Sequence, residues 1–246
     1  MSTELFFYKE NGTSARVPLT EDSLQKSVAY GEPRPVFGSL LTPVFLKNEK
    51  GEKYPFCLTV PSLRLGFDPS SYGDSGKMSA ELDFGDARNY KHVLGALNAF
   101  KALDDRFQAD VVKHRSVMVP GMKETGPAAK SNQQVKDSYL RMTRLRTSAK
   151  SDRAWPPRLS VNMTNAKNLT PETTEYKKGD AVTTLLLCTG LCARDNKIQP
   201  SWKVLQIRHQ KDGFPYPDQA LSEEEAFGAQ LSHEGSGAVT IDQAAI

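Results

Sequence analysis

The sequence contains few of the residues, and none of the short motifs, that mark the common catalytic and metal sites. Its 246 residues include three cysteines, Cys57, Cys188 and Cys192, and an odd number does not build a disulfide framework. No CxxC pair or nearby pair of histidines accompanies them, so we expect buried free thiols and no bound zinc. The four histidines are isolated, and the motifs GxSxG, HExxH, GxxxxGK[ST] and GxGxxG are absent. We therefore expect a protein that is not an enzyme and has no metal or cofactor.

Long apolar runs are also missing. Residues 1–10 lack the basic start and the apolar stretch of a secretory signal. No apolar run approaches the roughly 20 residues that a membrane-spanning helix needs. We therefore expect an intracellular protein that has no membrane partner.

The formal net charge of +3 hides a strong asymmetry along the chain. Neither Lys nor Arg occurs after Lys211, where acidic residues share the chain with Gly, Ser, Pro, Gln and Ala. Such a stretch cannot bury enough apolar area to order itself, so residues 212–246 are predicted to form a disordered acidic tail. Between residues 113 and 158 the balance is reversed, because Lys and Arg far outnumber Asp and Glu there.

Extended runs of Val, Leu, Thr and Ile form the most apolar part of the chain. In residues 178–209 two such runs flank the turn residues Asp195 and Asn196, which predicts an antiparallel hairpin. The first run is apolar on both faces, so it belongs in the middle of a sheet or in the wall of a small closed barrel. A helix is the competing interpretation, which Gly190 and the neighbouring threonines disfavour. Other runs predict a hairpin over residues 36–60 and strands over residues 77–84, 139–147 and 158–163.

One substantial helix is predicted, over residues 86–114. Apolar residues such as Val93, Leu97 and Phe100 recur there every three to four positions, and Asp86 is a suitable N-cap. Near the N-terminus, residues 5–8 predict an edge strand that could pair with a neighbouring subunit, and Thr20 could cap a short helix. The whole pattern predicts a mainly β protein with one substantial helix.

The cationic segment is the strongest functional signal. Lys and Arg can follow the phosphates of a nucleic acid, while aromatic rings stack on its unpaired bases. Tyr139 and Trp155 accompany the cations and are candidates for stacking. The alternative is a solvated basic loop that only keeps the protein soluble. The acidic tail could compete with nucleic acid for this segment or recruit replication proteins, or it could be an idle terminus.

A further indication comes from residues 181–209. The apolar strand, the short turn and the run Ser201 to Ile207 (SWKVLQI) resemble the closing hairpin of single-stranded-DNA-binding proteins of nucleocytoplasmic large DNA viruses, of the iridovirus and ranavirus type. The resemblance implies an elaborated, OB-fold-like antiparallel barrel over residues 35–211, preceded by an N-terminal arm over residues 1–34. It also implies cooperative binding to single strands during genome replication, in the host nucleus or at a cytoplasmic viral replication site. By position, Trp202 and Lys203 would lie near the binding groove.

We therefore expect a non-catalytic protein that binds single-stranded DNA without sequence preference, with RNA as the alternative ligand and with homo-oligomers left open. The expected nucleic-acid-binding residues are Lys113, Arg115, Lys123, Lys130, Tyr139, Arg141, Arg144, Arg146, Lys150, Arg153, Trp155, Arg158, Trp202 and Lys203. The alternative function is a virion-structural or protein-interaction scaffold whose basic segment binds polyanions in general. A nuclease on the same scaffold is a more distant alternative.

Overall fold

A computed structural model describes residues 4–8, 14–18, 24, 26–72, 77–118, 130–144, 146–148, 151–164, 166–168 and 175–210. These residues form a mainly β structure with one main helix, α2 (Lys91–Lys113), as predicted. None of the helices in the described ranges is both long enough and apolar enough to cross a membrane. The loop expected from Lys113 to Ser131 is described only at its ends, where residues 113 and 115–118 are helical. Its middle part, residues 119–129, the helix cap at Thr20 and the acidic tail lie outside the described residues.

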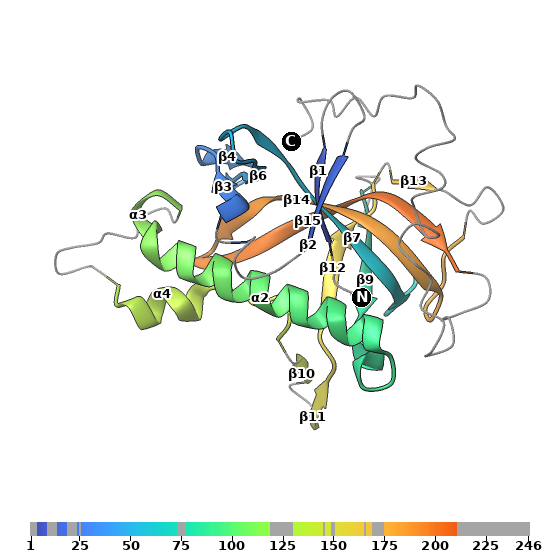
Figure 1. Ribbon diagram of the computed structural model, residues 1–246. Coiled ribbons are helices and arrows are strands. Elements are labelled where there is room, and N and C mark those ends of the chain that lie inside the picture. Colours follow the sequence, from blue (N-terminus) through green and yellow to red (C-terminus); the bar gives the residue numbers. More distant parts are fainter. Residues whose placement is uncertain are drawn as a thin grey trace.

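Five strands close into a ring. In chain order they are β7 (Lys53–Leu65), β9 (Lys77–Asp83), β12 (Arg158–Asn162), β14 (Ala181–Arg194) and β15 (Lys197–His209). Around the ring the order is β7, β9, β12, β15 and β14, and a pairing of β14 with β7 completes it (Figure 1). All neighbours are antiparallel except β12 and β15, which are parallel and share one register pair in the described residues, Asn162 with Lys203.

The long hairpin of β14 and β15 forms two neighbouring strands of this ring. Its strands meet at Asp195 and Asn196, both with positive φ, as a two-residue hairpin turn requires. The prediction of this hairpin is confirmed, and β14 is buried along nearly its whole length because it pairs with β15 and β7 and also with β5. Gly190 permits the last pairing, since a Cβ there would lie 2.4 Å from the carbonyl oxygen of Thr42.

Shorter strands extend the ring at its margins. They are β1 (Glu4–Tyr8), β2 (Ser14–Pro18), β3 (Val28–Tyr30), β4 (Arg34–Val36), β5 (Ser39–Thr42), β6 (Val44–Lys47), β8 (Ser70–Tyr72) and β13 (Lys167–Asn168). The predicted hairpin over residues 36–60 exists as the pair β6–β7, while β4 and β5 form a second hairpin that the sequence did not predict. The expected edge strand is instead internal, because β1 pairs with β7 on one side and with β2 on the other. Both edges of β1 are thus used within the chain.

Helix α2 lies across the ring and supplies much of its core (Figure 1). Phe100 and Phe107 are fully buried and meet the rings of Trp202 and Phe56 edge to face, with centroids 5.5 and 6.3 Å apart. The helix starts later than predicted, since residues 85–88 form a 3-10 turn and Tyr90 is the N-cap. Asp86 does not cap it, because its carboxylate pairs with Arg64 at 2.9 Å.

The segment after α2 differs most from the prediction. Two short helices, α3 (Arg115–Met118) and α4 (Asn132–Ser138), follow it, and Ser131 with Gln134 forms a capping box at the start of α4. The strand predicted over residues 139–147 is wrong for most of its length. Tyr139 makes an isolated bridge to Ile198, and residues 142–143 form a turn. Among the described residues of this range, only the last two belong to a strand, β10 (Arg146–Ser148), which pairs with β11 (Ser151–Trp155). The strand predicted at residue 158 is confirmed as β12.

Candidate nucleic-acid interface

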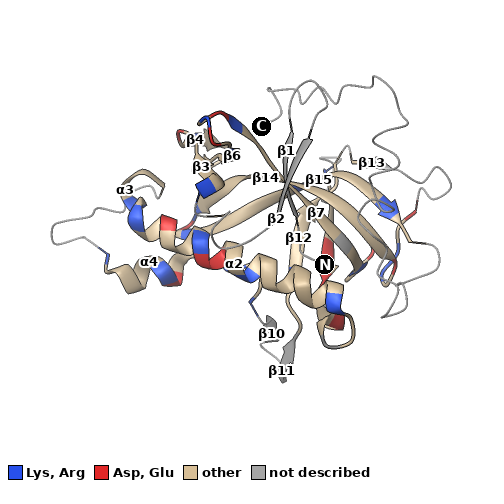
Figure 2. Ribbon diagram, in the orientation of Figure 1, with Lys and Arg blue, Asp and Glu red and all other residues tan. Residues whose placement is uncertain are grey.

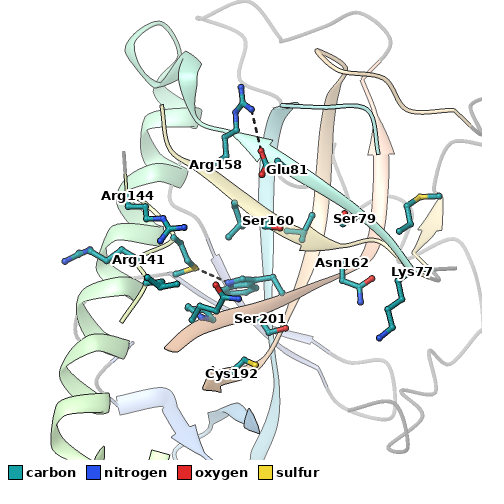
Figure 3. A pocket seen from close by; sticks show the side chains of 18 residues that line it. Lys77, Ser79, Glu81, Arg141, Arg144, Arg158, Ser160, Asn162, Cys192 and Ser201 are labelled. Carbon is teal, nitrogen blue, oxygen red and sulfur yellow. Dashed lines mark hydrogen bonds and ion pairs between the residues drawn. The ribbon is translucent and has the colours of Figure 1, made fainter. Parts of the chain in front are cut away.

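A hollow of about 440 Å³ opens where β12 and β15 separate (Figure 3). Beyond their pair at Asn162 and Lys203 the two strands share no ladder in the described residues, and residues 140–144 enter the gap. The other walls are β9, β12, the end of β14 and the start of β15. The hollow thus lies on the second and third strands of the ring, counted along the chain.

Strands β9 and β12 give the hollow a mixed lining of polar and apolar side chains. Ala80 and Leu82 in β9, like Leu159 and Val161 in β12, are buried in the core. The residues between them therefore face outward, because successive strand side chains point to opposite faces. Those that line the hollow are mostly neutral and can both donate and accept hydrogen bonds: Ser79, Ser160 and Asn162, with Glu81 as the acidic exception.

One wall of the hollow is anchored to α2 by Asp104. This fully buried carboxylate accepts hydrogen bonds from the hydroxyl of Tyr139 at 2.9 Å and the backbone N–H of Met142 at 2.9 Å. Its other oxygen accepts from the backbone N–H and the hydroxyl of Thr143, at 3.0 and 2.8 Å. Met142 in turn accepts a hydrogen bond from the indole N–H of Trp202 through its sulfur, at 3.0 Å. The wall that carries Arg141 and Arg144 is therefore held at a defined position.

The cations that line the hollow differ in how far their charge is compensated. Arg158 pairs with Asp83 at 2.8 Å and with Glu81 at 3.5 Å, and Arg141 pairs with Asp105. Arg144 is exposed and has no carboxylate partner in the described part of the chain. Lys77, at the start of β9, is also exposed. Charges of both signs follow one another along α2 as well (Figure 2). The excess of cations around the hollow is therefore smaller than the excess of Lys and Arg in the sequence between residues 113 and 158.

The predicted cations are distributed over two regions. Arg141, Arg144 and Arg158 line the hollow, whereas Lys203 is half-buried beside it on β15. Lys113, Arg115 and Lys130 lie near the C-terminal end of α2, about 12 Å along the helix from Asp105. Arg115 donates to the carbonyl of Lys130 and to Asn132, and Lys130 donates to Asn196. Lys123 and Lys150 lie outside the described residues, and for Arg146, Arg153 and Trp155 only the strand positions are described.

Two of the residues that were predicted to stack on bases, Tyr139 and Trp202, are buried. Tyr139 is 4% exposed, and burial together with the carboxylate of Asp104 raises the pKa of its hydroxyl. Trp202 lines the hollow, as expected from its position, but it is 2% exposed and packs edge to face on Phe56 and Phe100. Too little of either ring is exposed for a base to stack on it.

Sequence reasoning missed Lys77, Ser79 and Asn162, which line the hollow from β9 and β12. The signal was available, because the strand over residues 77–84 was predicted from its alternation. Its outward positions follow from that pattern, but nothing in the sequence marks which outward face borders a hollow.

The three cysteines are free, as predicted, and only Cys192 reaches the hollow. Burial raises the pKa of Cys57 to about 12 and also raises that of Cys188. Among the described residues no group of three or more His, Cys, Asp or Glu side chains could hold a metal ion.

No family model matches the chain, and no curated protein matches it. One solved structure with some likeness is the single-stranded DNA-binding protein from bacteriophage Enc34. The two sequences are 14% identical, the match covers 81% of this chain and 99% of that chain, and the TM-score is 0.36. At this identity and TM-score the likeness decides nothing about fold or ligand. The resemblance to iridovirus and ranavirus proteins is supported by no family model and stays an expectation.

Proposed function

We propose that this protein binds single-stranded nucleic acid, without catalysis and without sequence preference, across the hollow on β9 and β12. The observation that carries this proposal is the combination of exposed cations, Lys77 and Arg144, with a recess in which neutral polar side chains stand among apolar ones. In an OB-fold barrel the face of the second and third strands is the one that binds oligonucleotides. The hollow occupies the corresponding strands of the five-stranded ring.

The shape of the site favours a single strand over a duplex. Unpaired bases can turn out of a strand and enter a recess, whereas a duplex keeps its bases stacked inside. Neutral side chains that both donate and accept hydrogen bonds, such as Ser160 and Asn162, can meet any base. DNA is the expected ligand, and the use would be the replication of a viral genome, as in the viral proteins that the closing hairpin resembles. Contacts with replication proteins through the acidic tail belong to the same proposal.

Fluorescence anisotropy with labelled oligo-dT, the matching oligo-U and a matching duplex, at 50 and 200 mM salt, tests the proposal. Two or three phosphate contacts give a salt slope of about −1.4 to −2, hence a loss of affinity of roughly tenfold over this range. Much tighter binding to the single strand supports the proposal, and binding that is insensitive to salt contradicts it.

Variants test the location of the site. Arg144→Ala removes one phosphate contact, so we expect an affinity about three- to tenfold lower and a salt slope shallower by about 0.7. Lys101→Ala is the matched control, because Lys101 is exposed on α2 and does not line the hollow. Equal losses in the two variants would place binding elsewhere.

The scaffold alternative has one observation in its favour. Arg141 and Arg158 form ion pairs with carboxylates of the same chain, as residues with a structural role do. Equal affinity for the duplex and for the single strand in the same titrations would favour this alternative.

A further inference from the structure

Phe37 is an exposed aromatic residue that no role in the fold explains. It lies at the tip of the β4–β5 hairpin with 90% of its surface exposed, more than any other large apolar side chain in the described residues. A Phe side chain in water contributes nothing to the core. Its position therefore calls for a reason other than packing.

The backbone at Phe37 is also unfavourable for this side chain. Phe37 has φ +44° and Gly38 has φ +74°, so the two residues form a hairpin turn in which both central positions are left-handed. Asn, Asp or Gly is preferred at the first of these positions, and a bulky residue is sterically disfavoured there. The chain thus keeps a large ring where a small polar residue would fit better. Strain of this kind is found at binding sites.

The surroundings of Phe37 connect it to the hollow. The ammonium group of Lys77, a residue that lines the hollow, lies 5.0 Å from the centroid of the Phe37 ring. The hairpin is also tied to a wall of the hollow, because Leu41 in β5 pairs with Cys192 in β14. The ring therefore lies within reach of a strand that enters the hollow.

A similar arrangement occurs at Phe67, in the connection after β7. The guanidinium of Arg158 lies 4.6 Å from the Phe67 ring, which is half exposed. Two residues that line the hollow, Lys77 and Arg158, thus each contact an exposed aromatic ring. An aromatic face beside a cation suits a nucleotide, because the ring stacks on the base and the cation contacts the phosphate.

We propose that Phe37 stacks on an unpaired base of a single strand bound in the hollow, with Lys77 contacting the adjacent phosphate. This inference rests on the proposed function and supplies the base-stacking residue that Tyr139 and Trp202 cannot be. Charge favours nucleic acid over an apolar protein surface as the occupant, since the ammonium group of Lys77 lies 5.0 Å from the centroid of the ring.

The decisive variant is Phe37→Asn, measured with oligo-dT and with an oligomer of the same length that carries abasic sites. Asn suits the turn, so the variant should unfold at the same temperature as the wild type or a higher one. Loss of one stacked base should lower the affinity for oligo-dT by about tenfold or more. On the abasic oligomer the two proteins should bind equally, because the phosphate contacts are unchanged. Phe37→Tyr should retain wild-type binding.

Val117→Asn is the matched control, because Val117 is 57% exposed on α3 and lies away from the hollow. It should leave the affinity for oligo-dT unchanged. Wild-type binding to oligo-dT by Phe37→Asn overturns the inference and leaves the proposed function standing. Wild-type protein that binds no single strand overturns both. A change of molecular mass in solution caused by Phe37→Asn would assign the ring to a subunit interface and would also overturn the inference.

Discussion

Replacing Asp104 by asparagine changes one atom of a group on which the wall of the hollow depends. One carboxylate oxygen accepts from Tyr139 and Met142, and the other accepts two hydrogen bonds from Thr143. An amide has one acceptor oxygen and one donor nitrogen, so in either orientation one backbone N–H, of Met142 or of Thr143, faces another donor, while the hydroxyl of the same pair can turn to accept from the amide. One of the four hydrogen bonds is therefore lost, one is reversed, and the charge that strengthened all of them is removed.

The cost follows from these losses. A hydrogen bond to a charged group contributes about 1.5–3 kcal/mol, and a buried donor left without a partner carries its full desolvation penalty. Losing one such bond, leaving a backbone N–H without a partner and weakening the remaining bonds should lower the free energy of unfolding by roughly 2–4 kcal/mol, a sizeable share of the roughly 5–15 kcal/mol that stabilises a typical native protein. For a chain of this size this corresponds to a fall in Tm of about 4–16 °C.

Urea denaturation and thermal unfolding of Asp104→Asn measure this cost, and Asp105→Asn provides the control. Asp105 directly follows Asp104 in α2, but its side chain is 68% exposed, and among the described residues its side chain pairs with Arg141 alone. Its replacement should cost less than about 1 kcal/mol. The affinity for oligo-dT should also fall in Asp104→Asn at a temperature where the variant is folded, because Arg144 loses its anchored position. Equal stability of the two variants would refute the anchoring role of Asp104.

Two further predictions concern single side chains. In native protein, N-ethylmaleimide should label Cys192 and spare Cys57 and Cys188, because burial raises the pKa of these two thiols and excludes the reagent. Bound oligo-dT should slow the labelling of Cys192. A labelling rate, measured by mass spectrometry, that oligo-dT leaves unchanged would argue against strand binding at the hollow. Burial lowers the pKa of His92 below its ordinary value of 6.5, so the unfolded chain takes up this proton first and stability should fall as the pH drops below about 6.5. His92→Gln should weaken that fall in urea denaturation, and a pH dependence identical to that of the wild type would contradict this account.

The parts of the fold that could be predicted depend on local patterns. The β14–β15 hairpin follows from a run that is apolar on both faces and from the turn chemistry of Asp195 and Asn196. The strand β9 follows from its alternation, and the existence of α2 follows from its apolar periodicity. The start of α2 could not be predicted, because Asp86 is taken by Arg64, a partner 22 residues away.

The site could be predicted only in part, because the state of each side chain depends on residues far along the chain. Tyr139 follows a polar helix and precedes several arginines, which made it a plausible surface residue. In the structure it packs in the core, where the carboxylate of Asp104, 35 residues earlier, accepts a hydrogen bond from its hydroxyl. The Phe37–Gly38 turn had a local signal, since a glycine follows the phenylalanine between two extended runs. The sequence could not show that this turn lies near the hollow, because the contact that connects them, between Phe37 and Lys77, joins residues far apart in the chain.

Charge compensation within the chain sets how the proposed binding should depend on salt. The sequence places many cations between residues 113 and 158, and a protein that used them all would lose affinity very steeply as salt is added. In the structure, Asp105 and Asp104 compensate Arg141, and Asp83 with Glu81 compensates Arg158. Among the described residues that line the hollow, Arg144 is the arginine without a carboxylate partner, and Lys77 is a further exposed cation. A shallow slope combined with tight binding would therefore mean that stacking and neutral hydrogen bonds supply most of the affinity. A slope steeper than about −4 would mean that cations elsewhere, such as the group around Lys113, also contact the strand.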